Sequence, residues 1–186
     1  MHITNVPWML EHGLHCRSSP KFDPNFHSIG NPSLIKARHQ RPVPVEPGGR
    51  LSDYVPFYFT PYSIMLYNIK TGYGGVPQVP NEDLVILVSS LHRVAELGLK
   101  FVFTNQHAHP LTAEYFNGLE NLPRVDWPLL QRRDFKHDPE DPGKKERYQA
   151  EALVHRHLPV SALLGIGCHG QVAFARLQPE LEKVQE

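Results

Sequence analysis

A single acidic residue, Glu151, interrupts the most strand-like apolar run near the C-terminus, within KKERYQAEALVHRHLPV. Side chains alternate along a strand, so Ala152 and Val154 would share an apolar face, while Glu151 would lie with Leu153 and His155 on a mixed one. A half-solvated strand explains this carboxylate without any special role. A buried carboxylate without a partner is strongly disfavoured, so burial would instead indicate a functional group. The alternation leaves both interpretations open.

Basic side chains concentrate in two irregular segments. The first, IKARHQR at Ile35–Arg41, is typical of a solvated surface, although an arginine fork in a loop is also a natural partner for pyrophosphate or carboxylate. The second precedes Glu151 and mixes cations with rings, which suits a single-stranded nucleic acid because cations follow phosphates and rings stack on bases. Its basic and aromatic residues are Arg132, Arg133, Lys136, Lys144, Lys145, Arg147, Trp127, Phe135 and Tyr148. Acidic residues lie among them, so a charge-balanced surface loop is an equal alternative.

Two shorter motifs carry weaker signals. The triplet HIT at His2, Ile3 and Thr4 would place two polar side chains on one face of an extended segment, and a frayed N-terminus is the alternative. The piece TGYGGV matches neither GxGxxG nor GxxxxGK[ST] and lacks the strand-to-helix context of a phosphate-binding loop. We therefore interpret it as a turn.

The composition limits the class of protein. A chain of 186 residues suits one domain. Lys and Arg total 19, as do Asp and Glu, so any nucleic-acid site must be local. Cys16 and Cys168 lie far apart without a CxxC pair, which argues against a zinc site and against a disulfide-stapled secreted fold. With no apolar segment approaching 18 residues and no signal-like N-terminus, we expect a cytoplasmic protein without a bound metal.

The pattern of apolar residues and breakers predicts an α+β fold, with strands interleaved with helices and long loops but without regular βαβ spacing. Expected helices span Val6–Leu14, Ser90–Leu97 and Leu111–Leu122, with one helical turn at Pro32–Arg38. Expected strands are a buried one at Leu84–Val88, Lys100–Thr104, the run Tyr148–His157 and Ala162–Cys168, with a shorter one after Asp53. The segment Val125–Arg147 is predicted to be a polar loop.

Taken together, these segments resemble the DarT family of bacterial toxins, NAD-dependent ADP-ribosyltransferases that modify a base in single-stranded DNA. The resemblance covers HIT, SIGNPSLIKARHQRPVPV, PGGRLSDYVPFYFTPYSIMLYNIKTGYGGV, VILVSSLHRVAELGLKFVFT and KKERYQAEALVHRHLPV. DYVPFYFTP followed by a distant RYQAEALV is much more specific than a single catalytic motif. The resemblance implies an ADP-ribosyltransferase-like fold over residues 1–186, with central, mostly antiparallel sheets flanked by helices and long loops.

The resemblance also implies roles for particular residues. Glu151 matches the glutamate that holds the nicotinamide ribose and stabilises the oxocarbenium-like transition state, and Arg38 matches the arginine that binds NAD phosphate and helps remove the proton from the target base. The triplet at His2, Ile3 and Thr4 matches the NAD-contacting element. Trp127–Arg147 corresponds to the substrate-recognition loop. The residues in and beside this loop that the resemblance implies as DNA contacts are Arg132, Arg133, Lys144, Lys145, Arg147 and Tyr148. NAD is the implied co-substrate, and an antitoxin that removes ADP-ribose, often a macrodomain protein, is the implied partner.

Departures from the family pattern define a competing hypothesis. NVPWML is shorter than the usual HITxxxNLxxIL, Ile64 replaces a usual Pro, Asn105 replaces a common Asp, and the chain ends at LEKVQE, so a truncation at the C-terminus is left open. The competing hypothesis is a catalytically silent remnant that binds single-stranded nucleic acid or an antitoxin. An enzyme that acts on protein is a third, weaker alternative. Which base is modified, thymine or guanine, depends on loop conformation and stays open.

Overall fold

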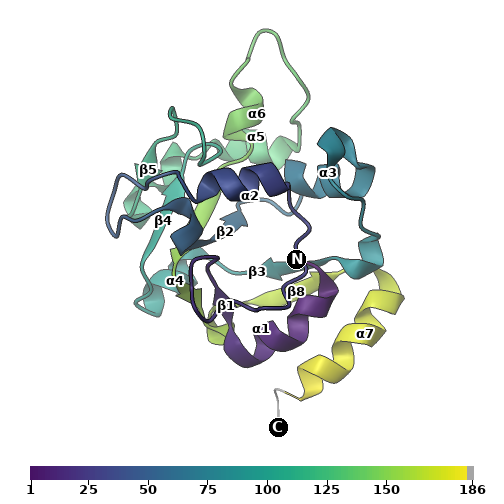
Figure 1. Cartoon of the computed structure of the whole chain (residues 1–186). Coiled ribbons are helices and arrows are strands. Elements are labelled where there is room, and N and C mark those ends of the chain that lie inside the picture. Colours follow the sequence, from purple (N-terminus) through teal and green to yellow (C-terminus); the bar gives the residue numbers. More distant parts are fainter. Residues whose placement is uncertain (184–186) are drawn as a thin grey trace.

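A four-stranded antiparallel sheet, in the order β2-β6-β4-β5, forms the centre of the computed structural model, which describes residues 1–183 (Figure 1). Its strands are β2 (Tyr54–Tyr58), β6 (Glu151–His155), β4 (Phe101–Thr104) and β5 (Tyr115–Phe116). Two smaller antiparallel pairs join β1 (Leu14–His15) to β7 (His157–Leu158) and β3 (Val85–Val88) to β8 (Gly165–Cys168). This arrangement confirms the predicted α+β class with antiparallel sheets.

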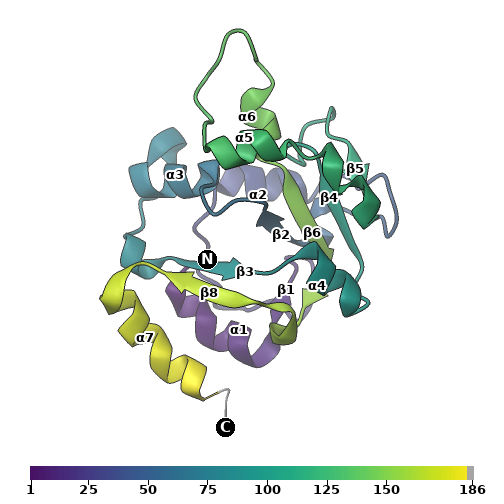
Figure 2. The same cartoon turned by 180° about the vertical axis from the view of Figure 1, so that it is seen from behind.

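The helices gather at two ends of the molecule. Figures 1 and 2 show α1 (Val6–His12) and α7 (Gly170–Glu182) at one end, beside the β3–β8 pair. At the other end lie α2 (Pro32–Arg38), α3 (Ile64–Thr71), α5 (Trp127–Arg132) and α6 (Lys144–Arg147), and the loop between α5 and α6 projects outward. The short α4 (Leu91–Glu96) precedes β4. Within residues 1–183, no helix has the length and apolar character needed to cross a bilayer.

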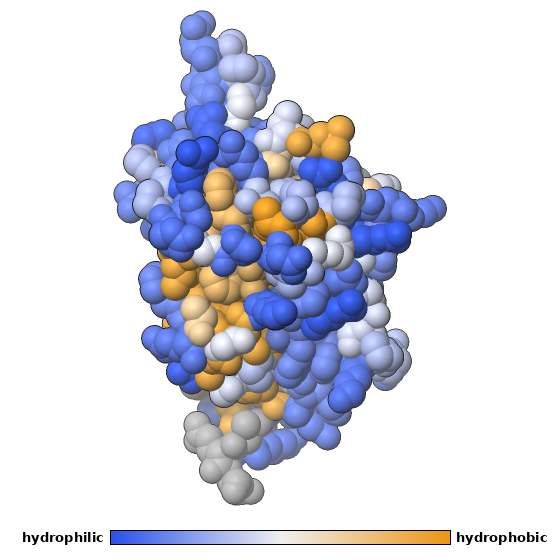
Figure 3. Space-filling view, turned by 90° about the vertical axis from the view of Figure 1, so that its left-hand side faces the viewer, coloured by the Kyte–Doolittle hydropathy of each residue, from blue (hydrophilic) through white to orange (hydrophobic). Residues whose placement is uncertain are grey.

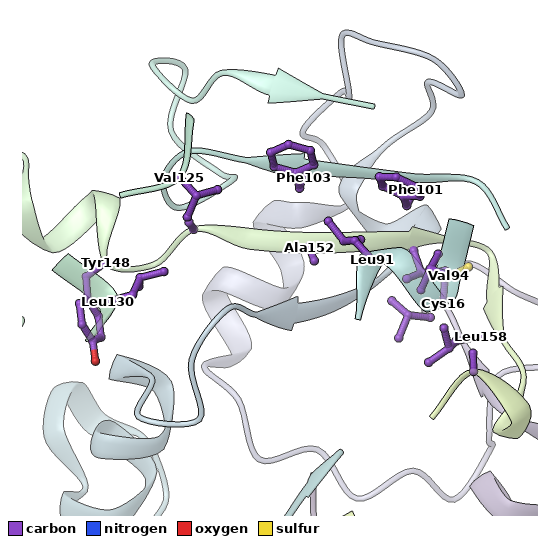
Figure 4. Close-up of a cluster of buried hydrophobic side chains, with 14 of the residues drawn as sticks. Cys16, Leu91, Val94, Phe101, Phe103, Val125, Leu130, Tyr148, Ala152 and Leu158 are labelled. Atoms are coloured by element: carbon purple, nitrogen blue, oxygen red, sulfur yellow. The ribbon is translucent and has the colours of Figure 1, made fainter. Parts of the chain in front are cut away.

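Both faces of the central strand β6 are buried. On one face Ala152 and Val154 join a large apolar cluster that includes Phe103, and Figure 4 shows Phe101 and Phe103 on β4 close to Ala152. On the other face Leu153, with no exposed surface, packs in a second cluster under the loop that carries Val43 and Leu51. The half-solvated interpretation of this strand is therefore wrong, because loops cover the face that carries Glu151.

One side of the molecule has a mainly polar surface. Figure 3, which shows the side at the left of Figure 1, is mostly hydrophilic, with apolar residues gathered in a band down its middle. The β3–β8 pair is less buried than the sequence suggested, since Ile86 is 38% and Val88 46% exposed. The prediction of a buried strand at Leu84–Val88 was correct in type but only partly correct in burial, because Val85 and Leu87 face the cluster formed with α1 and α7, whereas Ile86 and Val88 point to the opposite, exposed face.

The N-terminal segment differs from the extended arrangement predicted for HIT. Residues Ile3–Asn5 form a 3₁₀ turn, and the ring nitrogen Nδ1 of His2 caps it by accepting the N–H of Thr4 at 3.3 Å. The following helix ends at Gly13, as predicted. A side chain at Gly13 would meet the Leu158 carbonyl oxygen at 2.6 Å, and the backbone there has a φ of +75°, so glycine suits this helix end for both reasons.

Two expectations for the segment after β4 were wrong. The helix expected at Leu111–Leu122 is instead β5 followed by a 3₁₀ helix, Leu119–Arg124, because Tyr115 and Phe116 pair with Thr104 and Phe103. The expected loop Val125–Arg147 contains α5 and α6. Helix α5 begins at Asp126, whose carboxylate accepts the N–H of Leu129 at 3.1 Å, a typical N-cap bond. The single turn predicted at Pro32–Arg38 is confirmed as α2, and Asn31 caps it.

Candidate active site at the start of strand β6

Glu151 is the first residue of β6 and is almost fully buried, with 2% of its surface exposed. It pairs with Tyr58 of β2 in the antiparallel register, so both side chains lie on the same face of the sheet. On the β4 side, the Thr104 hydroxyl accepts the N–H of Glu151 at 3.2 Å and donates to the Gln106 carbonyl at 2.6 Å. The sheet therefore fixes the backbone of Glu151 from two neighbouring strands.

Three groups surround the carboxylate of Glu151. Arg38 donates from Nη1 to Oε2 at 2.9 Å, although the two residues lie 113 positions apart in the chain. The backbone N–H of Ala108 donates to Oε1 at 3.1 Å, and Nε2 of His107 lies 3.7 Å from the same oxygen. A buried carboxylate is tolerated when it is paired and hydrogen-bonded in this way. The structure thus supplies the partners that the sequence left unidentified.

Two buried nitrogens beside Glu151, and a third on Arg41, retain unused hydrogen-bonding capacity. Within the described residues, Nη2 of Arg38, Nε of Arg41 and Nε2 of His107 have no hydrogen-bond partner. Arg41 donates from Nη2 to the Pro110 carbonyl at 3.0 Å, which holds its guanidinium in the same region. Buried polar groups are normally satisfied, so these nitrogens indicate a place where a polar ligand completes the contacts. An anion with several oxygen acceptors fits such a donor set.

Two neutral groups complete this environment. Burial, followed by the Glu151 carboxylate, raises the pKa of the Tyr58 hydroxyl, so it stays protonated at neutral pH. Burial lowers the pKa of His107 below its ordinary value, and this effect outweighs the opposing influence of Glu151. His107 is therefore neutral at neutral pH. Arg38 and Glu151 are left as a close pair of opposite charges between two uncharged side chains.

Among residues 1–183, the triplet His2, Ile3 and Thr4 makes its side-chain contacts with residues other than Arg38 and Glu151. The His2 ring stacks on His27 with centroids 3.7 Å apart, and its Nδ1 lies 2.7 Å from the Thr4 hydroxyl. Ile3 is 5% exposed and packs in the core against α7. Figures 1 and 2 both show the N-terminus between the level of α2 and that of the β3–β8 pair. His2 thus lies against His27, in the segment that precedes α2, while the Ile3 side chain packs in the core.

The predicted DNA contacts divide into two groups. Tyr148 is 1% exposed and sits in the core, Lys144 is 8% exposed and donates to Asp134 at 2.5 Å, and Arg147 binds Asp141 at 2.6 and 3.0 Å. These three side chains make contacts that hold the loop together, and their role as DNA contacts stays a prediction. The other three, Arg132, Arg133 and Lys145, are exposed. Among the six predicted contacts, these three make no ion pair with residues 1–183, so their charges are available to a phosphate.

Sequence reasoning missed His107, Ala108, Thr104 and Tyr58. Thr104 and Tyr58 end the strands that flank β6, and His107 and Ala108 follow Thr104 by a few residues. A usable signal was the placement of FTNQHA directly after a clear strand. Without the order β2-β6-β4, however, nothing in the sequence brings that segment to Glu151. Within the described residues, no group of three or more His, Cys, Asp or Glu side chains is arranged to hold a metal ion.

Stability should fall as the pH drops below about 6.5, and His107 should account for part of the loss. Because its pKa is lower in the folded protein than the ordinary 6.5, the unfolded chain binds the extra proton first. The contribution is present above pH 6.5, begins to be lost below it, and is gone once the pH has fallen through the lower pKa of His107 in the folded protein, at up to about 1.4 kcal/mol per pH unit for one group. Urea unfolding between pH 7.5 and 5.5 measures it. His107→Gln should flatten the profile, and an unchanged slope would contradict this assignment.

Comparison with known proteins places this geometry in context. Residues 1–185 match the family described as DarT, ssDNA thymidine ADP-ribosyltransferase. A DNA ADP-ribosyl transferase of Escherichia coli O127:H6 is 52% identical over 178 residues, which cover 96% of this chain and 82% of that protein. The structure of Thermus sp. 2.9 DarT in complex with ADP-ribosylated ssDNA aligns over 100% of this chain and 86% of its own, with a TM-score of 0.91 and 34% identity. The same protein in complex with NAD+ aligns with a TM-score of 0.83 at 34% identity, over 100% of this chain and 87% of that one.

Proposed function

The chain belongs to the DarT family of single-stranded DNA thymidine ADP-ribosyltransferases, and we propose that its Arg38–Glu151 site transfers ADP-ribose from NAD to thymidine in single-stranded DNA. One observation carries the proposal: a glutamate that is 2% exposed meets an arginine from a distant helix at 2.9 Å, beside nitrogens that lack partners. A purely structural ion pair would have no need of those unused nitrogens.

Glu151 would act through its charge. NAD supplies a glycosidic bond whose cleavage releases nicotinamide and leaves positive charge on the ribose. A fixed carboxylate in a site that excludes water stabilises such a charge much more strongly than one in solution. Arg38, the Ala108 N–H and the backbone bond to Thr104 hold Glu151 in place. Little reorganisation is then needed when the charge develops.

Arg38 would act as a fixed cation. Its Nη1 orients Glu151, and its free Nη2 can donate to a phosphate or ribose oxygen of NAD. Arginine does not lose its proton in proteins, so it is a poor general base. A cation placed beside thymine still lowers the pKa of the one ring N–H in that base, which eases removal of its proton. This gives Arg38 a role in deprotonation without requiring it to accept the proton.

The remaining predicted residues would bind the two substrates. His2 and Thr4 would contact NAD through their side chains, and Ile3 through its backbone alone, because its side chain is in the core. Arg132, Arg133 and Lys145 would contact DNA phosphates. Lys144, Arg147 and Tyr148 would support the loop that presents those cations.

The family also suggests a biological setting. We propose that the protein is the toxin of a toxin–antitoxin pair, that it acts in the cytoplasm where NAD and DNA are both present, and that its antitoxin is a macrodomain-type hydrolase that removes ADP-ribose. Induced expression in a bacterial host should arrest growth, and coexpression of such a hydrolase should restore it. Growth that is unaffected by the active protein would argue against the toxin role.

Incubation of the purified protein with NAD and short single-stranded oligonucleotides tests the proposed reaction. Oligonucleotides that contain a thymidine should gain the mass of one ADP-ribose with release of nicotinamide, and the same sequences without thymidine should not. Transfer to guanosine alone would correct the base, and transfer to protein alone would correct the substrate class. If the oligonucleotides gain no mass and calorimetry detects no NAD binding, the protein is the silent remnant.

Two of the departures from the family pattern, Ile64 and Asn105, have local explanations. Ile64 begins α3 and is 5% exposed in the core. Asn105 donates to the Glu114 carboxylate at 2.8 Å and accepts the Glu114 N–H at 3.2 Å, whereas an aspartate would place two like charges together. These substitutions have local explanations that leave the Arg38–Glu151 contact intact, which favours the enzyme over the silent remnant.

A further inference from the structure

Three exposed tyrosines, Tyr62, Tyr67 and Tyr73, form a ridge on and beside α3 that the proposed site does not use. They are 46%, 47% and 62% exposed. The rings of Tyr67 and Tyr73 lie with centroids 6.4 Å apart. We call these residues the tyrosine ridge. A group of aromatic rings exposed to water is energetically unfavourable, and such groups are typical of binding surfaces.

Contacts with Phe135 and the buried Tyr148 support the tyrosine ridge. Tyr67 contacts Phe135 edge to face with centroids 5.6 Å apart, and Phe135 contacts the buried Tyr148 at 5.2 Å. The Tyr148 hydroxyl donates to the Tyr62 carbonyl at 3.2 Å. These contacts connect the tyrosine ridge to the core, so the rings form a firm platform for a flat ligand.

Arg133 extends this platform with a cation. Its guanidinium lies 3.8 Å above the ring of Tyr62. Arg133 caps the C-terminus of α5 with a φ of +55°, a left-handed backbone conformation that is uncommon for residues other than glycine. Stacking occupies one face of the guanidinium and leaves its N–H edge free, since the Arg133 side chain makes no hydrogen bond or ion pair with residues 1–183. This edge is suited to an anionic oxygen pair such as a phosphate.

The tyrosine ridge lies at the same end of the sheet as Glu151. Tyr58, which pairs with Glu151, is the last residue of β2, and Tyr62 follows it by four positions. Tyr148, which binds the Tyr62 carbonyl, precedes Glu151 by three positions. Figures 1 and 2 both show α3 at the end of the molecule that carries α2, α5 and α6. A strand of nucleic acid that reaches Glu151 can therefore continue onto the tyrosine ridge.

Charges around the tyrosine ridge favour an anionic chain. In the loop beside it, Asp134 is bound by Lys144, and Asp126 and Asp141 are bound by Arg147. Four exposed cations make no ion pair with any described residue: Arg132, Arg133, Lys136 and Lys145. The carboxylates are thus largely occupied within the loop, and the unpaired groups at its surface are mainly cations.

We propose that the tyrosine ridge and Arg133 bind the nucleotides that flank the target base in single-stranded DNA, with bases stacked on Tyr67 and Tyr73 and a phosphate at Arg133. This inference deepens the proposed function and depends on it for the identity of the substrate. Stacking needs a free base face, which single strands offer and duplexes do not.

Binding of a fluorescent single-stranded oligonucleotide to the full-length Glu151→Gln variant, which separates binding from turnover, tests the proposal. Adding Tyr67→Ala or Tyr73→Ala should weaken binding roughly 5- to 100-fold, the range measured when a stacking ring is removed. Tyr67→Phe should bind like its parent because the ring remains. Phe174→Ala removes a ring that is 50% exposed on the distant α7 and serves as the matched control. The affinity of the protein for a duplex of the same sequence should change less than twofold in each of these variants.

Kinetics of the variants with an intact Glu151 separate this proposal from the proposed function. Tyr67→Ala should raise KM for the oligonucleotide and leave KM for NAD and kcat at saturating oligonucleotide unchanged. If the wild-type protein transfers ADP-ribose and the alanine variants match it in KM and affinity, the tyrosine ridge is not a DNA site. If the wild-type protein transfers nothing while ridge variants still lose affinity, the proposed function fails and the ridge remains a binding surface.

Discussion

Glu151→Gln is expected to lower the rate of ADP-ribose transfer by at least about 10²- to 10³-fold, the typical effect of removing one preorganised electrostatic group from an active site. Glutamine has the shape of glutamate and can still accept the Ala108 N–H that now bonds Glu151 at 3.1 Å. It has no charge to stabilise the ribose cation. Initial rates of oligonucleotide modification, measured by mass spectrometry under saturating NAD, give the effect.

The matched control for this prediction is Glu140→Gln, which neutralises an exposed carboxylate in the loop between α5 and α6. It should leave the transfer rate within about twofold of wild type, because surface charges in water interact weakly with a distant site. Glu151→Gln should also keep a cooperative unfolding transition. A variant that is folded and retains most of its activity would remove Glu151 from the proposed mechanism.

Arg38→Met is expected to abolish transfer and to release α2 from the sheet. Removing one partner of a buried ion pair costs about 3–5 kcal/mol, because the other charge is left uncompensated. The Arg38 side chain is 14% exposed and that of Glu151 is 2% exposed, so the pair meets this condition. Apart from the partly buried Arg38, α2 contributes no side chain to the core, so detachment of this helix can limit the loss of global stability. Hydrogen exchange should show faster exchange of α2 amides, and thermal unfolding should show a lower Tm.

The double variant Arg38→Met/Glu151→Met separates electrostatics from packing. Replacing both partners by apolar side chains is often neutral or stabilising, so the double variant should regain stability relative to Arg38→Met while remaining inactive. Lys36→Met is the control: it removes a cation at an exposed position of the same helix and should affect neither exchange nor transfer. Unchanged exchange in Arg38→Met would mean that other contacts hold α2.

Several elements could be predicted because their signals are local. Asn31 and Pro32 define the start of α2, Gly13 ends α1, and Lys100–Thr104 is a run of strand-forming residues. Such features depend on backbone geometry within a few positions. The helix expected at Leu111–Leu122 failed because pairing of Tyr115 and Phe116 with β4 outweighed helix propensity.

The long segment before β6 shows a different limit. Its composition correctly indicated a mixture of cations and rings, but it could not indicate which of them were structural. Tyr148 and Lys144 turned inward, and Arg133 turned outward onto Tyr62. The energetic balance depends on partners elsewhere, such as the Tyr62 carbonyl that accepts from Tyr148. Burial of a polar group is decided by whether such a partner is present.

The sequence by itself determined the family, the strand that carries Glu151 and the helix that carries Arg38. Only the tertiary structure decided that these two side chains meet at 2.9 Å, that His107 and Ala108 lie against the Glu151 carboxylate, and that Tyr62, Tyr67 and Tyr73 lie at the same end of the sheet. The physical reason is the range of the forces involved. Helix caps and strand alternation act over a few residues, whereas the burial of Glu151 depends on a pairing across 113 positions that exists only after the sheet has formed.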